Sequence, residues 1–301
     1  MKVLRTPDAC FEGLPDYNYQ PHYTTVQADD GTPLRFHHID EGPADAEPIV
    51  LIHGNPTWSY LYRHMIPELL KTGRRVIALD LMGCGRSDKP SSKSDYTLAR
   101  HCDWMQQWLI ANDLKNITLF CQDWGGTLGL NLVANHPERF DRVIASNTGV
   151  PTGTGGNRWL RIWLAAMRYA PFFPWRLAFR KTLLREMTPQ EYAAFEKAPF
   201  PARKYQAGII KFPALITVFP DHPEVDINRD TWRKLKSFDK PFLTLFGNRD
   251  PVSKGFEKAI QRSIPGAHGQ AHKIIDGGGH FIQEDKPAEL VAEIIPFLEV
   301  R

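Results

Sequence analysis

The chain has 301 residues, of which 42% are hydrophobic and 24% are charged, the composition of an ordinary globular protein. Its 37 basic and 34 acidic residues leave a net charge of +3, too balanced to predict a partner surface for nucleic acid or an anionic membrane. No stretch approaches the roughly 18 uninterrupted apolar residues of a membrane span, and residues 1–13 lack the apolar core of a signal peptide. Four cysteines without a CxxC pair are expected to be free thiols in a reducing compartment, which favours the cytoplasm.

Predicted strands and helices alternate along the first half of the chain. Short apolar runs predict strands at 34–39, 48–52, 75–80, 116–121 and 142–147. Helices are predicted at 97–112 and 124–136, and another follows the loop at 53–56 and ends at Gly73. This alternation predicts an α/β protein, with a mostly parallel central sheet flanked by helices on both faces.

The alternation stops at residues 151–230, which are helical in pattern, rich in proline and without a clear buried strand. Strands resume at 241–247 and 272–276, and an amphipathic helix is predicted at 287–299. We therefore divide the chain into a first part of an α/β core at 1–150, a helical cap, or lid, at 151–230, and a second part of the core at 231–301.

The segment 116–136 is predicted to run from a strand through a tight turn into a helix, with Asp123 at the turn. In a nucleophile elbow the residue at the tip is held above the sheet, and small neighbours let the backbones approach closely. The usual sequence is G-x-S-x-G, whereas here Asp replaces Ser and Cys121 replaces the first Gly. By itself, Asp123 is equally compatible with the N-cap of a helix.

An acid and a histidine follow in the chain order that an α/β-hydrolase fold requires. Asp250 comes directly after one predicted strand, and His280 comes after the last one, preceded by three glycines. A neutral His280 oriented by Asp250 would be a general base, with Asp123 as the nucleophile. No metal or organic cofactor is implied, because carboxylate, imidazole and water suffice for this chemistry.

The loop His53-Gly54-Asn55-Pro56 follows a predicted core strand. In this fold the corresponding loop supplies one backbone N–H of an oxyanion hole, and the residue after the nucleophile supplies the other. Those residues are Asn55 and Trp124 here. The alternative is a Gly/Pro turn without a catalytic role.

An aspartate nucleophile restricts the reaction. A carboxylate with a reference pKa of about 3.9 is already ionised at neutral pH, and it suits displacement at saturated carbon rather than acyl transfer. The product is an alkyl ester on Asp123, which water activated by His280 would then hydrolyse. Two leaving groups fit this logic, a halide and the oxygen of a strained epoxide.

Three motifs resemble the haloalkane dehalogenase family: DWGG at 123–126, HGNPTWSYLYR at 53–63 and GGGHFIQED at 277–285. The resemblance covers essentially the whole chain, including DLMGCGRSDKP at 80–90. It implies a triad of Asp123, Asp250 and His280, and a helical cap over the core. It also implies a small halogenated alkane, halide and water as the partners, with a primary alcohol as product. We expect a monomer.

The same resemblance implies two tryptophan N–H groups that hold the halide. An indole is a donor only, so it binds an anion without presenting a competing acceptor. Trp124 matches the first position, and Trp163 in the cap is the best match to the second, with Trp159 and Trp175 as alternatives. Each of the cap tryptophans is also compatible with ordinary packing.

Asn55 departs from the subfamily whose acid follows the same strand as Asp250, where a glutamate is usual. An asparagine there resembles the halide-binding amide of a sister subfamily, which carries its acid where this chain has Asn147. An amide cannot serve as that acid, which favours Asp250. The Asn55 side chain is therefore either a third halide donor or a loop residue that contributes only its backbone N–H.

Two other functions share parts of this pattern. An epoxide hydrolase has the same aspartate and histidine but needs two cap tyrosines, for which Tyr169, Tyr192 and Tyr205 are available. The cap segment YQAGIIKFP at 205–213 instead favours a dehalogenase. A non-catalytic binding protein of this fold would usually lose the nucleophile or the histidine, and both are present. We therefore predict a haloalkane dehalogenase.

Overall fold

The computed structural model describes residues 1–154, 162 and 174–300. Trp159, Trp163 and Tyr169 lie outside these described residues. Among the helices described, none is both long enough and apolar enough to cross a membrane.

An eight-stranded sheet forms the centre of the molecule, in the order β10-β9-β8-β7-β4-β5-β3-β2. Pairing is parallel from β10 to β5 and antiparallel between β5, β3 and β2. Every residue of β4, β7 and β9 is buried, as the continuous apolar runs in their sequences predict. The strands are β2 (His22–Gln27), β3 (Pro33–Glu41), β4 (Pro48–Ile52), β5 (Arg75–Leu79), β7 (Ile117–Gln122), β8 (Phe140–Ser146), β9 (Phe242–Gly247) and β10 (Lys273–Ile275).

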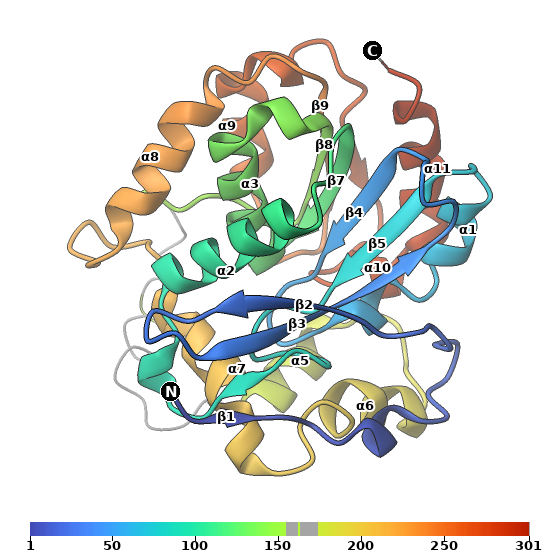
Figure 1. Cartoon of the computed structure of the whole chain (residues 1–301). Helices are drawn as coiled ribbons and strands as arrows, with labels where there is room; N and C mark the ends of the chain where they lie inside the picture. Colours follow the sequence, from blue (N-terminus) through green and yellow to red (C-terminus); the bar gives the residue numbers. More distant parts are fainter. Residues whose placement is uncertain (155–161, 163–173, 301) are drawn as a thin grey trace.

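Helices cover both faces of this sheet (Figure 1). One face carries α2 (Leu98–Ala111), α3 (Trp124–Asn135) and α8 (Val225–Leu235), and the other carries α1 (Ile66–Leu70) and α11 (Pro287–Phe297). Helix α9 (Phe256–Ser263) packs on β9, and the short α10 (Ile282–Asp285) leads into α11. This is the α/β-hydrolase arrangement that the sequence predicts.

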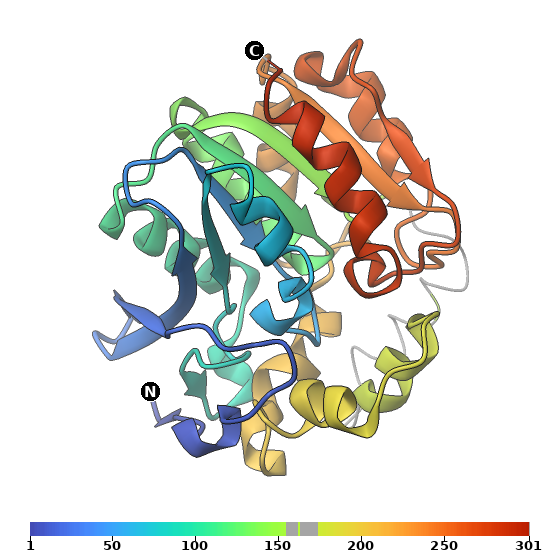
Figure 2. The ribbon, with the colours of Figure 1, turned by 90° about the vertical axis from the view of Figure 1, so that its right-hand side faces the viewer.

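Three short helices, α5 (Trp175–Thr182), α6 (Pro189–Glu196) and α7 (Ala207–Lys211), lie together below the sheet in Figure 2, where α11 is at the front. No strand occurs between residues 151 and 230 in the described part of this segment. Residue 230 falls within α8, whose Thr231 accepts a hydrogen bond of 2.7 Å from Asn131 of α3. The C-terminal end of the predicted cap is therefore attached to the helical layer of the core.

Several elements have weak signals in the sequence. Strand β2 is an edge strand with one buried residue, Val26, so it lacks a clear apolar pattern. The two-residue strands β1 (Val3–Leu4) and β6 (Lys89–Pro90) pair only with each other and are too short to be predicted. In contrast, β4 spans the predicted residues 48–52 without any shift.

Candidate active site

Asp123 lies at the sharp turn between β7 and α3. Its backbone has φ 52° and ψ −122°, a sparsely populated conformation held by its N–H bond to the Asn147 carbonyl at 3.2 Å. A Cβ on Gly125 would lie 2.1 Å from the Ile52 carbonyl oxygen, and one on Gly126 would lie 1.8 Å from Oγ1 of Thr148. The two glycines are therefore required for the turn to pack this closely against its neighbours.

The Asp123 side chain does not cap α3. Its Oδ1 instead accepts the backbone N–H of Asn55 at 2.8 Å, and its Oδ2 lies 3.3 Å from Nε2 of His280. Asp123 therefore occupies the N-cap position of α3 without capping the helix through its side chain, and its carboxylate contacts Asn55 and His280 instead.

His280 connects the two aspartates. Its Nδ1 lies 3.0 Å from Oδ1 of Asp250, and the histidine is only 4% exposed. Burial alone would lower the pKa of His280, but the carboxylates of Asp250 and Asp123 outweigh it and raise the pKa to about 10. While Asp123 carries its charge, His280 is therefore an imidazolium at neutral pH.

Asp250 is buried, and both of its oxygens are fully engaged. Oδ1 also accepts the N–H of Val252 at 2.8 Å, and Oδ2 accepts the N–H of Ser253 at 3.2 Å together with its hydroxyl. Burial favours the neutral acid, but His280 and these hydrogen bonds lower the pKa of Asp250. Ser253 stands three residues after Asp250 and is not among the site residues predicted from the sequence.

Two amides hold the backbone at His280. The His280 carbonyl oxygen accepts hydrogen bonds from Nε2 of Gln122 and Nδ2 of Asn147, each at 3.0 Å. Asn147 also donates to the Gly279 carbonyl at 2.7 Å and accepts the N–H of Gly247 at 2.8 Å. Asn147 is thus a brace between the ends of β8 and β9 and the His280 loop, a role that its sequence position alone does not reveal.

The loop after β4 is held from behind by His53. Nε2 of His53 accepts the Leu81 N–H at 2.9 Å, so the proton sits on Nδ1, which donates to the Gly54 carbonyl at 2.8 Å. Burial lowers the pKa of His53, which keeps it neutral. A Cβ on Gly54 would lie 2.3 Å from the Asp123 side chain, so this loop must carry glycine.

The two predicted oxyanion donors differ in position. Asn55 already donates its backbone N–H to Asp123. Trp124 is the first residue of α3. Within the described part of the chain, its backbone N–H makes no hydrogen bond to the Asp123 carboxylate. Asn55 thus engages the carboxylate in the resting site.

The Trp124 indole lies beside the nucleophile position. It packs against Phe212 of the cap with ring centroids 4.9 Å apart, and it lines a cavity together with Asp123, Ile216 and Val252. Its indole N–H has no hydrogen-bond partner among the residues described.

Comparisons with known proteins identify the family. A family model of the α/β-hydrolase fold matches residues 47–287. The chain is 47% identical over 299 residues to a haloalkane dehalogenase of Psychrobacter cryohalolentis, which covers 99% of this chain and 98% of that protein. It is also 47% identical over 297 residues to haloalkane dehalogenase 1 of Mycobacterium tuberculosis, covering 98% of each. The chain belongs to the haloalkane dehalogenase family.

A solved structure supports the same assignment. The tetrameric haloalkane dehalogenase DpaA of Paraglaciecola agarilytica matches with a TM-score of 0.87 and 33% identity over 97% of both chains. The predicted fold and the predicted activity are thus confirmed, and the protein is a hydrolase that acts on carbon–halide bonds.

Two of the three tyrosines that an epoxide hydrolase could use, Tyr192 and Tyr205, lie in the described part of the chain. Tyr192 packs under the guanidinium of Arg180 at 4.4 Å, and Tyr205 lies beside Lys204 at 5.4 Å. Neither is among the described residues that line the cavity next to Asp123.

The remaining halide candidates have different outcomes in this dehalogenase. Trp175 donates its indole N–H to Oε1 of Gln206 at 3.3 Å, so that donor is already used. Trp163 and Trp159 lie outside the described residues. Oδ1 of Asn55 is buried without a hydrogen-bond partner within the described part of the chain, but a halide would need the Nδ2 donor of this amide instead.

Proposed function

We propose that the dehalogenase reaction begins with attack of Asp123 on the halogen-bearing carbon. The observation that carries this proposal is the Asp123 carboxylate, which contacts Asn55 N–H and His280 instead of capping its helix. Because Asn55 holds Oδ1, Oδ2 is the oxygen that attacks. A bond forms between Oδ2 and carbon as the carbon–halogen bond breaks, and the halide leaves with both electrons of that bond.

We propose that the halide leaves into a pocket formed by Trp124, the cap residue Trp163 and the side-chain amide of Asn55. The first contact is supported by Trp124 lining the cavity beside Asp123, with no hydrogen-bond partner for its indole N–H among the described residues. A desolvated pocket with donors only stabilises a developing anion and offers no base to compete with it.

The second step hydrolyses the ester. His280 takes one proton from water, and the water oxygen bonds to Cγ of the Asp123 ester. The resulting charge on Oδ1 is stabilised by the backbone N–H groups of Asn55 and Trp124. Collapse expels the alkoxide, which receives the proton from His280 and leaves as a primary alcohol. The other proton of the water stays on the new acid group of Asp123 and is released to solvent.

The charge on Asp123 sets the order of these steps. In the resting site two carboxylates keep the pKa of His280 at about 10. Esterification removes the charge of Asp123, so the pKa of His280 falls and the imidazole can lose its proton. The base thus becomes available only after the ester that it must hydrolyse has formed.

Replacement of the base tests this mechanism. His280→Gln mixed with 1-bromobutane should release one bromide per protein, and intact-protein mass should increase by one butyl group located on Asp123. The wild-type enzyme should release bromide and butanol continuously. Styrene oxide is run in parallel, and diol formation without any bromide release from bromobutane would contradict the proposal.

We further propose that residues 151–230 form the cap that closes this site, that the enzyme is a monomer, and that it works in the cytoplasm. All four cysteines are free thiols, as expected in a reducing compartment. Sedimentation velocity tests the monomer, because the related DpaA is tetrameric.

A further inference from the structure

The cap contacts the core directly behind His280. A Cβ added to Gly279 would lie 2.6 Å from Oδ2 of Asp285, 2.9 Å from Cγ of Leu184 and 3.0 Å from the carbonyl oxygen of Thr182. Thr182 ends α5, and Leu184 belongs to the connection between α5 and α6. The cap backbone therefore packs against the residue that precedes His280.

A pair of rings makes a second contact on the other side of the histidine. Phe179 of α5 meets Phe281 edge-on, with centroids 5.2 Å apart, and Phe281 lies 4.9 Å from the His280 ring. Both phenylalanines are buried. His280 thus stands between two residues that each touch the cap.

One carboxylate joins the two segments. Oδ2 of Asp285 accepts the N–H of Gly279 at 2.9 Å, while Oδ1 accepts the N–H groups of Leu184 and Arg185 at 2.9 and 3.0 Å. Hydrogen bonds to a charged acceptor are the stronger kind. Asp285 is therefore shared between the His280 loop and the α5–α6 connection.

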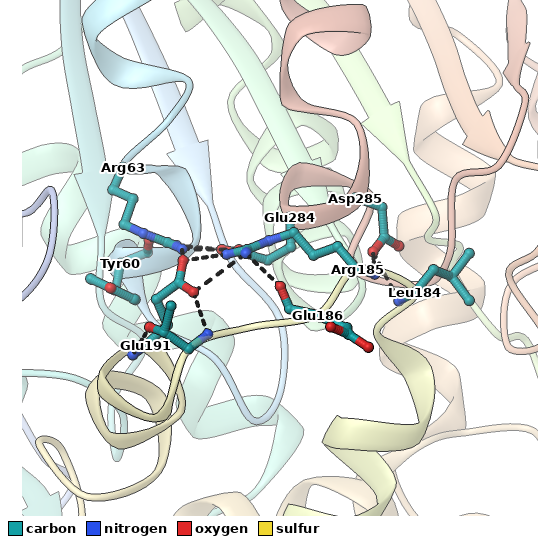
Figure 3. A network of polar contacts seen from close by, with 9 residues as sticks. Tyr60, Arg63, Leu184, Arg185, Glu186, Glu191, Glu284 and Asp285 are labelled. Carbon is teal, nitrogen blue, oxygen red and sulfur yellow. Dashed lines mark hydrogen bonds and ion pairs between the residues drawn. The ribbon is translucent and has the colours of Figure 1, made fainter.

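A cluster of two arginines and two glutamates reinforces this junction (Figure 3). Arg63, which follows the helical turn after β4, donates to Glu191 of α6 at 2.9 Å and to Glu284 of α10 at 3.0 Å. Arg185 of the cap donates to each of the same glutamates at 2.6 Å. The side chains of Arg63 and Glu284 are fully buried, so these charges depend on one another.

This cluster also contains groups that could ligate a metal, since ligand atoms of His64, Glu191 and Glu284 lie within 4.8 Å of one another. Both carboxylates already accept hydrogen bonds from two guanidinium groups. A cation placed there would be repelled by Arg63 and Arg185 at short range. The cluster is better described as a set of ion pairs that joins the cap to the core.

We propose that Asp285 is a positioning residue for dehalogenation: its carboxylate ties the cap connection to the N–H of Gly279 and so fixes His280 at its working distance from Asp123. This inference rests on the proposed role of His280 as the base for ester hydrolysis. Attack by Asp123 needs no base, so a displaced His280 slows the second step of the reaction and spares the first.

Asp285→Asn tests the proposal, because an amide has only one acceptor oxygen for three N–H groups on two segments. A displacement of about 1 Å in a reacting group typically costs about 100-fold in rate. In rapid-quench single turnovers with 1-bromobutane, bromide release should stay within about threefold of wild type. Butanol release should fall by about 100-fold, and the butyl ester should accumulate on Asp123.

The two release rates separate positioning from general damage. A variant that is only partly folded loses amplitude in both phases and keeps their ratio, whereas the proposal requires the ratio to change. Butanol release at the wild-type rate in folded Asp285→Asn would overturn it. If that result came with ester accumulation in His280→Gln, only this inference would fall. Absence of ester in His280→Gln would overturn the proposed function itself.

Asp285→Glu provides a second variant if Asp285→Asn does not fold. It keeps the negative charge but adds one methylene, so the carboxylate no longer fits between the N–H of Gly279 and the N–H groups of Leu184 and Arg185, and butanol release should slow relative to bromide release in the same way. An unchanged ratio in folded Asp285→Glu would also overturn the proposal. Glu289→Gln is the matched control, because its ion pair with Lys286 at 3.0 Å is exposed, and both rates should stay at their wild-type values.

Discussion

The core side and the cap side of the site are built differently. On the core side, Asp123 comes directly after β7, and Asp250 and His280 lie in the loops that follow β9 and β10 of the same sheet. On the cap side, the described contacts come from short helices and from the connections between them, such as Phe212 against Trp124. The sheet therefore sets where Asp123, Asp250 and His280 lie, and residues 151–230 add further contacts around them.

In the proposed mechanism, this difference also separates the steps of the reaction. The proposed attack by Asp123 uses the strained turn and the Asn55 N–H, both of which belong to the core. Halide release depends on Trp124 from the core and a proposed partner from the cap. Hydrolysis depends on His280, which the core holds through Asn147 and the cap contacts through Gly279.

The largest expected effect lies on the core side. Asp123→Ala removes the group to which the substrate becomes bound, so turnover of 1-bromobutane should fall by about 10⁴-fold or more, into the background. Bromide release measured with an ion-selective electrode checks this result, with circular dichroism to verify folding. Residual release of even about one per cent would mean that another group performs the displacement.

The core side of the site is easier to predict from the sequence than the cap side, because its residues follow the strands of the sheet. Strand β4 and the turn at Asp123 are local features, because a short apolar run and a Gly-Gly pair determine them within a few residues. Asp250 and His280 are predictable because parallel strands bring their C-terminal ends to one edge of the sheet.

Contacts between distant segments are not predictable in this way. Gln122 and Asn147 hold the His280 carbonyl, yet nothing in their own neighbourhood distinguishes a bracing amide from any other polar residue. The partners of Asp285 lie in a cap whose connections carry no regular pattern. Similarly, nothing in the sequence around Trp175 predicts that Gln206 accepts the hydrogen bond of its indole N–H.

The halide donors provide the next test of the comparison. Trp124→Phe should slow bromide release by about 10²–10³-fold, the usual cost of losing one preorganised donor. Trp163→Phe should have a similar effect if the cap contributes equally. Chloride quenching of tryptophan fluorescence should weaken in both variants. If Trp159→Phe weakens the quenching and Trp163→Phe does not, Trp159 is the cap donor.

A smaller effect concerns stability and pH. His280 has a reference pKa of 6.5 that the folded protein raises to about 10, so its stabilising contribution is complete below pH 6.5 and is lost as the pH rises toward 10. The excess Tm of the wild-type enzyme over His280→Gln should therefore shrink between these pH values. An excess that grew with pH would mean that the folded protein favours neutral His280.

The smallest effect returns to the cap. Trp175→Phe removes one hydrogen bond to Gln206 and keeps the ring contact with Phe200, so the free energy of unfolding in urea should fall by about 1 kcal/mol. Chloride quenching and bromide release should not change, because the indole N–H of Trp175 is already used inside the cap. A loss of halide affinity here would instead show that the cap rearranges around the anion, and that its donor is selected only when the ligand is bound.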